Sequence, residues 1–147
     1  MVLVEPEIPQ NTGNIARLCA LTETPLHLVG KLGFSTNNYY LRRAGLDYWD
    51  CLSLHSHNDL SELIGLCRSR FLFVSTKAHR LYTEIQYVED DHLVLGSETR
   101  GLSRDLIESN LENSIRIPLW GAKPRSLNLS NAAAVVLYEA LRQTRRF

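Results

Sequence analysis

The sequence of 147 residues lacks any apolar run long enough to cross a membrane. Its first ten residues, MVLVEPEIPQ, are too short and too acidic for a signal peptide. These two absences argue against a membrane protein and against a secreted one. We therefore expect a soluble chain in the cytoplasm, with no membrane partner.

Cysteine is scarce as well. Cys19, Cys51 and Cys67 are odd in number, widely spaced and embedded in apolar runs. This pattern argues against a disulfide framework and a zinc site, and it predicts buried free thiols in a reducing compartment. The five histidines are scattered without metal-ligand spacing, so we expect no metal. The nearest pair, His55 and His57, is interpreted as a strand end and a loop.

The chain carries no net charge, with 16 basic and 16 acidic side chains, which argues weakly against a nucleic-acid partner. The distribution is less even. Residues 1–99 hold 8 basic and 12 acidic groups, whereas residues 100–147 hold 8 basic and 4 acidic groups. The last three arginines, Arg142, Arg145 and Arg146, are explained by a solvated helix end at least as well as by an RNA surface.

Apolar residues at 44% and charged residues at 22% describe an ordinary globular chain, and its length fits one domain over residues 1–147. Short apolar runs predict strands, and apolar residues at helical spacing predict helices. The predicted strands cover residues 1–4, 26–29, 51–55, 71–75, 93–96 and 114–118; the predicted helices cover about 14–21, 38–44, 59–68, 103–109 with Ser103 as N-cap, and 129 onward. This alternation predicts an α/β fold with a mainly parallel sheet and helices on both faces.

The stretch from residue 117 to 134, IPLWGAKPRSLNLSNAAA, reads as the end of a strand, an irregular loop and a helix. Ser126, Asn128 and Ser130 stand between loop and helix, beside backbone N–H groups that are free. One of them caps the helix, and Ser126 and Asn128 are surplus to that cap. A free helix N-terminus after the carboxyl end of a strand is also where α/β proteins bind ligands.

Two further loops follow predicted strands and hold small or polar residues that a core does not need. They are NTGNIAR at residues 11–17 and GSETRGL at residues 96–102. The first has a single glycine and is no GxGxxG fingerprint, which disfavours a nicotinamide-dependent enzyme; the second lacks the Gly-Lys-Ser/Thr of a P-loop. Within the second loop, we expect Glu98 to bond nearby backbone or an arginine.

Together these motifs resemble the SPOUT superfamily of RNA 2′-O-ribose methyltransferases, especially the branch that methylates the wobble nucleotide of tRNA (the TrmL/YibK type). NTGNIAR is similar to the family's first motif, GSETRGL to its second, and IPL with RSLNLSNAAAVVLYEALRQ to its third. EPEIPQNTGNIARLCA and LRRAGLDYWD also resemble that branch, so the similarity covers nearly the whole chain. Two departures lie at the rim of the expected pocket: WGAKP is about one residue longer than usual, and Ser97 stands where the branch usually has proline.

The resemblance implies a C-terminal trefoil knot, a homodimer and S-adenosyl-L-methionine as cofactor. It implies an enzyme that methylates the ribose 2′-hydroxyl of the wobble nucleotide, cytidine or uridine, in the tRNA anticodon loop. The cofactor contacts that it implies are Val74, Gly96, Ile117, Ser126 and Leu127. Glycine suits such a position because the missing Cβ lets a ligand approach the backbone closely.

The resemblance also implies Arg17, Ser126 and Asn128 as catalytic residues. The RNA-binding residues that it implies are Arg42, Arg43, Arg125 and Tyr138. Most of these have a structural alternative: Arg17 can be a surface helix arginine, Tyr138 can pack in the core, and the other arginines can be solvated.

Two other functions stay open on the sequence alone. The nearer one is 2′-O-methylation of another position in tRNA or in rRNA. The other is a non-enzymatic RNA-binding module, which would use the basic half of the chain without the pocket around Gly96 and Ser126. Cofactor binding distinguishes such a module from an enzyme.

Overall fold

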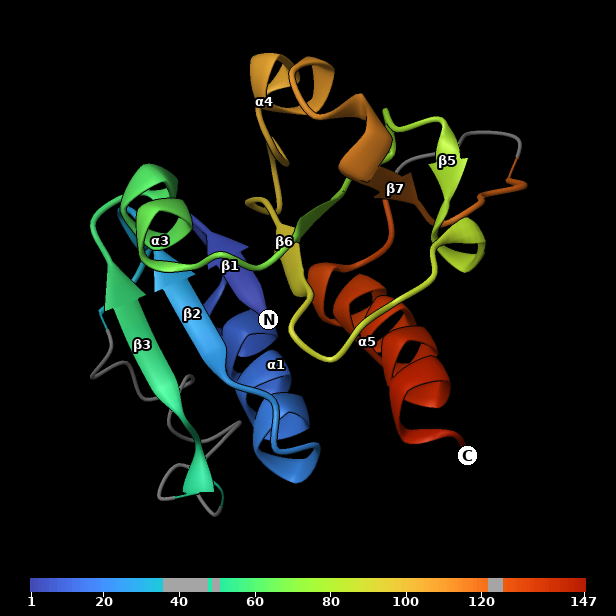
Figure 1. Ribbon diagram of the computed structural model, residues 1–147. Coiled ribbons are helices and arrows are strands. Elements are labelled where there is room, and N and C mark those ends of the chain that lie inside the picture. Colours follow the sequence, from blue (N-terminus) through green and yellow to red (C-terminus); the bar gives the residue numbers. More distant parts are fainter. Residues whose placement is uncertain (36–47, 49–50, 122–125) are drawn as a thin grey trace.

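The computed structural model describes residues 1–35, 48, 51–121 and 126–147. In these residues seven strands form one sheet, in the order β3-β2-β1-β6-β4-β7-β5, and all neighbouring strands are parallel (Figure 1). The strands are β1 (Val2–Val4), β2 (Leu26–Val29), β3 (Leu54–His57), β4 (Phe71–Val74), β5 (Arg80–Leu81), β6 (His92–Leu95) and β7 (Ser114–Arg116). The prediction of a parallel sheet is confirmed.

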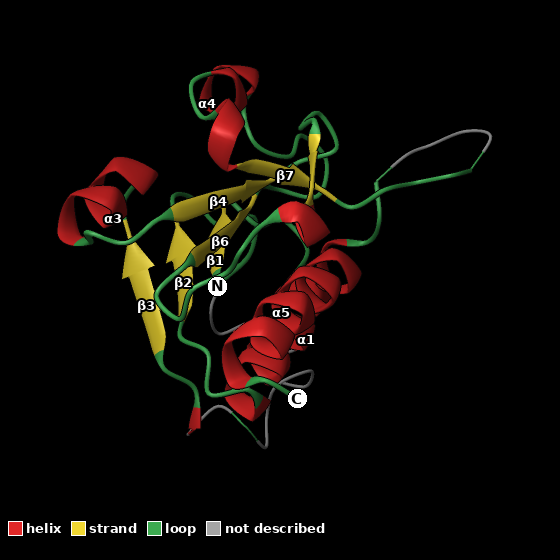
Figure 2. Ribbon diagram, turned by 45° about the vertical axis from the view of Figure 1, so that its right-hand side comes forward, coloured by secondary structure: helices red, strands yellow, loops and turns green. Residues whose placement is uncertain are grey.

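Helices cover both faces of this sheet (Figure 2). Helices α1 (Pro9–Leu21) and α5 (Leu129–Arg145) lie on one face, and α3 (Leu60–Leu66) and α4 (Arg104–Glu108) lie on the other. Two short 3-10 helices, η2 (Tyr82–Glu84) and η3 (Leu111–Asn113), join the remaining strands. Within the described ranges, no helix is long and apolar enough to cross a membrane.

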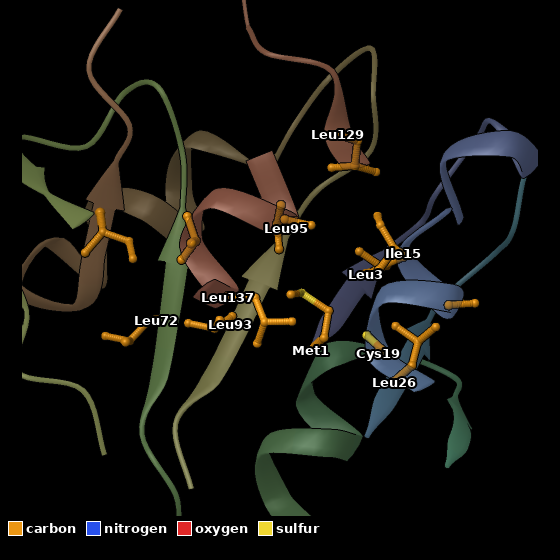
Figure 3. Close-up of a cluster of buried hydrophobic side chains, with 14 of the residues drawn as sticks. Met1, Leu3, Ile15, Cys19, Leu26, Leu72, Leu93, Leu95, Leu129 and Leu137 are labelled. Atoms are coloured by element: carbon orange, nitrogen blue, oxygen red, sulfur yellow. The ribbon is translucent and has the colours of Figure 1, made fainter. Parts of the chain in front are cut away.

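The two helical layers follow from the alternation of side chains along each strand, because neighbouring residues point to opposite faces. Leu3, Leu72 and Leu93 belong to the core cluster that packs against α1 and α5, together with Ile15 and Leu137 (Figure 3). The second cluster, on the face of α3 and α4, takes the alternate residues; it contains Val2, Phe73, Val94, Leu63 and Ile107. Both faces of the central strands are therefore buried, as a parallel sheet requires.

The helix caps were predicted in part. Ser103 accepts a hydrogen bond from the backbone N–H of Leu106 at 3.2 Å, so its predicted role as N-cap of α4 is confirmed. At the start of α5 the cap is Asn128, which accepts from the backbone N–H of Ser130 at 2.9 Å. The prediction that Asn128 is surplus to the cap is wrong, since Ser130 already lies inside the helix.

Two element boundaries differ from the sequence prediction. The helix expected from residue 14 begins at Pro9, because proline at the first helical position gives up only an N–H that has no helical partner. The strand expected at 51–55 lies at Leu54–His57, where its register pairs Leu54 with Leu26. The helix expected at 38–44 lies outside the described residues.

The prediction of three buried thiols is correct only for Cys19. Cys67 is half-buried, and Cys51, which lies three residues before the edge strand β3, is exposed. All three are free thiols.

Four histidines from β2, β3 and β6 lie close together, which their scatter along the sequence did not indicate. His27 Nδ1 lies 3.0 Å from His57 Nε2, and the His27 ring stacks on that of His55 with centroids 4.9 Å apart. The ring of His92 lies 5.6 Å from that of His27. The interpretation of His57 as a loop residue is wrong, since it belongs to β3. Among the described side chains, no group of three or more could hold a metal ion.

Candidate functional site

A cavity of about 760 Å³ opens at the carboxyl ends of the central strands. In the sheet, the later strands flank β1 on both sides: β2 and β3 lie on one side of β1, and β6, β4, β7 and β5 lie on the other. Parallel sheets bind ligands at the carboxyl edge where the strand order reverses in this way. The cavity is formed by the segments after β4, β6 and β7 and by the start of α5.

All five predicted cofactor contacts line this cavity: Val74, Gly96, Ile117, Ser126 and Leu127. Asn128, one of the predicted catalytic residues, lines it as well. Val74 is the last residue of β4, and Gly96 directly follows β6, so the sheet itself brings them to one edge. Ile117, Leu95 and Leu119 supply apolar walls, while Ser126 and Asn128 supply polar groups from the third motif.

The glycines of the second motif shape the loop that closes one side of the cavity. The backbone N–H of Gly101 donates to the carbonyl of Ser97 at 2.8 Å, and Gly101 has a φ of 66°, which favours glycine. A Cβ on Gly96 would overlap the backbone of Gly101 and Leu102. Glycine is therefore required at position 96 by the loop itself, a reason that differs from the ligand approach expected from the sequence.

Glu98 ties this loop to the start of α1. Its carboxylate accepts hydrogen bonds from the backbone N–H groups of Glu7 at 2.7 Å and Ile8 at 3.2 Å, and from the side-chain amide of Asn11 at 3.0 Å. The expectation that Glu98 bonds nearby backbone is confirmed. The side chain of Ile8, the N-cap of α1, accepts no hydrogen bond, so Glu98 provides the negative charge at that helix end.

Asn128 completes a chain of contacts that joins all three motifs. Its Nδ2 donates to Oδ1 of Asn11 at 2.9 Å, and its Oδ1 accepts from the backbone of α5. Both ends of the amide are therefore engaged. Asn128 can hold the start of α5 against α1, but its oxygen already has hydrogen-bond donors and is poorly placed to accept a proton from a substrate.

Arg17, the third predicted catalytic residue, does not line the cavity. It is exposed on α1, and its guanidinium carbon lies 5.0 Å from the ring centroid of Tyr48. The structure of one chain thus brings Ser126 and Asn128 together and leaves Arg17 apart from them.

Among the predicted RNA-binding residues, Arg42, Arg43 and Arg125 lie outside the described part of the chain. Tyr138 is 50% exposed on α5 and makes an edge contact with the ring of Phe147. The alternative that Tyr138 packs in the core is therefore wrong.

Three basic side chains that line the cavity were not predicted as site residues from the sequence; they are Lys77, Arg100 and Arg116. Lys77 lies in the segment after β4, and Arg116 is the last residue of β7 with its Nε donating to the carbonyl of His79 at 3.3 Å. Their positions after parallel strands were the available signal. Arg100 lies in the segment after β6 and forms ion pairs with Glu5 at 3.4 Å and Glu7 at 3.9 Å.

Comparison with known proteins identifies a family that matches this chain. The SpoU rRNA Methylase family matches residues 1–138. Two proteins named tRNA (cytidine(34)-2′-O)-methyltransferase, from Saccharophagus degradans and Methylovorus glucosotrophus, are each 46% identical to this chain over 145 residues, with 97% of this chain and 94% of theirs covered. A solved structure from work on the 2-OH methylation of C/U34 on tRNA has a TM-score of 0.91 and 39% identity, covering 97% of this chain and 93% of that one.

Proposed function

The chain belongs to the SpoU rRNA methylase family, and from that premise we propose that it methylates the wobble nucleotide of tRNA. The methyl group goes from S-adenosyl-L-methionine to the ribose 2′-hydroxyl of cytidine or uridine in the anticodon loop. The observation that carries the proposal is the cavity of about 760 Å³, which all five residues expected to contact the cofactor line. Methylation of another tRNA or rRNA position is the second candidate, because related enzymes differ in their RNA target more than in their fold.

The residues around the cavity fit the proposed cofactor. Its volume lies in the range of about 300–1,000 Å³ that is usual for small-molecule sites. Ile117 and Leu127 offer apolar surfaces for an adenine ring, while Ser126 and nearby backbone groups offer hydrogen bonds. When bound there, the cofactor supplies a methyl group that is activated by its sulfonium charge.

The chain's own groups position the substrate and stabilise charge. A guanidinium has a pKa above about 12 and keeps its proton, so Arg17 acts as a fixed positive charge toward a phosphate and the developing alkoxide. A substrate phosphate or water accepts the proton of the hydroxyl. Asn128 keeps α5 and its neighbour Ser126 in place through its bonds to Asn11 and to the helix backbone.

A homodimer supplies what one chain lacks. Arg17 lies outside the cavity of its own chain, so a second copy has to bring this side chain to the reaction. Exposed apolar side chains on α5 and α1 are available for that contact; they are Val135 at 37%, Tyr138 at 50% and Leu21 at 60% exposure. The trefoil knot, the single-domain assignment over residues 1–147 and the cytoplasmic location also stay predictions.

Thermal melting with ligands tests the cofactor assignment. S-adenosylhomocysteine should raise the melting temperature by mass action, whereas NAD should not. A non-enzymatic RNA-binding module would respond to neither nucleotide. Equal stabilisation by both, or none by either, would reject the proposed function.

Arg17 is tested by methyl transfer with purified variants. Arg17→Ala should lower the rate by roughly a hundredfold or more, the range seen for one electrostatic donor, while S-adenosylhomocysteine binding stays near wild type. Arg104→Ala is the matched control, since Arg104 is an exposed helix arginine away from the cavity. Arg17→Lys should restore part of the rate with no new ionisation in the pH profile. A rate that climbs as the new amine deprotonates would show that this side chain acts as a base.

A further inference from the structure

The side chain of Arg17 has one defined partner in the described part of the chain, the aromatic face of Tyr48. The guanidinium carbon lies 5.0 Å from the centroid of that ring. This distance is within the roughly 6 Å over which a cation is attracted to the face of an aromatic ring. Among the described residues, no hydrogen bond or ion pair involves the Arg17 guanidinium.

The backbone near both partners is anchored. The carbonyl of Tyr48 accepts from the backbone N–H of Cys51 at 3.1 Å, and Leu52 packs against the core cluster of α1 and α5. One residue further on, the carbonyl of Ser53 accepts from the N–H of Leu26 in β2 at 2.8 Å. Tyr48 is thus hydrogen-bonded to Cys51, and the segment 51–53 is joined to the core and to β2 directly before β3 begins.

The backbone that carries Arg17 is also held in place by buried neighbours. Its neighbours Ile15 and Ala16 are 0% and 2% exposed, and Cys19 is fully buried, so this part of α1 is locked in the core. Of the two side chains, the long arginine has the greater number of rotamers to lose. An exposed arginine loses considerable rotamer freedom when a reaction requires one position of its charge. A ring that holds the guanidinium before the substrate arrives reduces that cost.

An aromatic partner suits a cation that has to act on a substrate. A guanidinium stacks with its flat face on a ring while its N–H donors, which lie in its plane, stay available for phosphate or alkoxide oxygens. A carboxylate partner would neutralise the charge and occupy those same donors. The contact with Tyr48 therefore restrains Arg17 without using the groups that the reaction needs.

We propose that Tyr48 is a positioning residue for methyl transfer, which holds the Arg17 guanidinium by its ring face. The proposal rests on the proposed function, in which Arg17 stabilises charge on the ribose. Tyr48 acts through Arg17 and through its ring, so its hydroxyl is dispensable.

A double-mutant cycle on the full-length protein tests this role, with tRNA methylation as the readout. Tyr48→Phe should stay within about twofold of the wild-type kcat, and Tyr48→Leu should lower kcat by about threefold to tenfold, the range of one cation–π contact. The KM for tRNA and the binding of S-adenosylhomocysteine should change by less than twofold. In an Arg17→Ala background, Tyr48→Leu should have no further effect, because the two residues act as one unit.

A second series keeps the shape of the ring and so does not depend on how Tyr48→Leu folds. Phenylalanines with one, two or three ring fluorines at position 48 weaken the negative ring face stepwise, and kcat should fall with each fluorine. The same series at Tyr82 is the matched control, because that ring packs against the core without an arginine contact recorded in the described residues. A structural role would give the same rate for all fluorinated variants.

Three results would overturn the proposal. They are a rate independent of fluorine number, an equal loss from Tyr48→Leu with and without Arg17, and a raised KM for tRNA at unchanged kcat, which would mean that the ring stacks on RNA. Failure of the proposed function is distinguishable, since the wild-type protein would then transfer no methyl group to tRNA. A fully active Arg17→Ala variant would refute the roles of both residues while leaving the methyltransferase assignment intact.

Discussion

Replacing Glu98 by glutamine removes the charge from the carboxylate that joins the second motif to the first. The carboxylate receives three donors, the N–H groups of Glu7 and Ile8 and the amide of Asn11, at 2.7, 3.2 and 3.0 Å. A glutamine side chain has one oxygen. Whichever way its amide turns, its NH₂ group faces at least one of these donors, so at least one hydrogen bond is lost.

The size of the effect follows from those three bonds. A hydrogen bond to a charged group contributes about 1.5–3 kcal/mol to stability, and one between neutral groups about 0.5–1.5 kcal/mol. Glu98→Gln loses one charged bond and weakens the other two. Because Glu98 is only half-buried, solvent reduces the total, and we expect a loss of about 2–3 kcal/mol in the free energy of unfolding. In a protein of this size, that corresponds to a melting temperature lower by about 5–10 °C.

Urea denaturation of the purified variant measures this loss directly. Glu108→Gln is the matched control, since Glu108 is 64% exposed and lies 3.9 Å from its only recorded ion-pair partner in the described residues, Arg104. That control should stay within about 0.5 kcal/mol of wild type. The stabilisation by S-adenosylhomocysteine should also fall for Glu98→Gln, because a neutral oxygen binds the Asn11 amide more weakly than the carboxylate does, and Asn11 in turn contacts Asn128. A Glu98→Gln variant as stable as Glu108→Gln would refute the role given to this carboxylate.

Three further predictions concern other parts of the molecule. Burial first, then the nearby N-terminal ammonium and three other histidines, lower the pKa of His27 to about 4. Between pH 6.5 and 4.5 the unfolded chain therefore binds a proton at His27 that the folded chain does not bind. The free energy of unfolding should fall by about 1–2 kcal/mol as the pH drops over this range. His27→Gln should flatten that fall in urea denaturation, the exposed His79→Gln should not, and an unchanged pH dependence would contradict the assignment. The hydroxyl of Thr12 is buried without a hydrogen-bond partner in the described residues, so Thr12→Val should leave the melting temperature equal or higher, and a drop of several degrees would reveal a partner. Gly96→Ala should destabilise the protein even without ligand, because its Cβ meets the backbone of the 97–102 loop; normal stability with weakened S-adenosylhomocysteine binding would instead support the ligand-approach explanation.

The layers of the fold could be predicted because they depend on local patterns. Alternation such as Val2 and Leu3 assigns neighbouring residues to opposite faces, and each apolar run marks one strand. The five cavity residues were named through the resemblance of three motifs, and parallel strands then carry them to one edge. The first helix is predicted to begin only at about residue 14 because proline usually interrupts elements, although proline is well tolerated at a helix start.

Contacts between distant segments could not be predicted in the same way. The bond between Asn11 and Asn128 spans 117 residues, and the one between Asn11 and Glu98 spans 87. Their existence depends on the order of the strands, which periodicity does not contain. The stack of His27 on His55 could not be predicted for the same reason. It arises only because β2 and β3 pair in a register that places these two residues side by side.

Methyl transfer to a defined tRNA is the most direct test of the proposed function. Purified protein is incubated with methyl-labelled S-adenosyl-L-methionine and a tRNA, or with the same tRNA carrying a 2′-deoxynucleotide at the wobble position. We predict that the unmodified tRNA incorporates label and that the deoxy-substituted tRNA incorporates none. Equal incorporation into both RNAs would contradict the proposed target, and no incorporation into any tRNA or rRNA would contradict the methyltransferase itself.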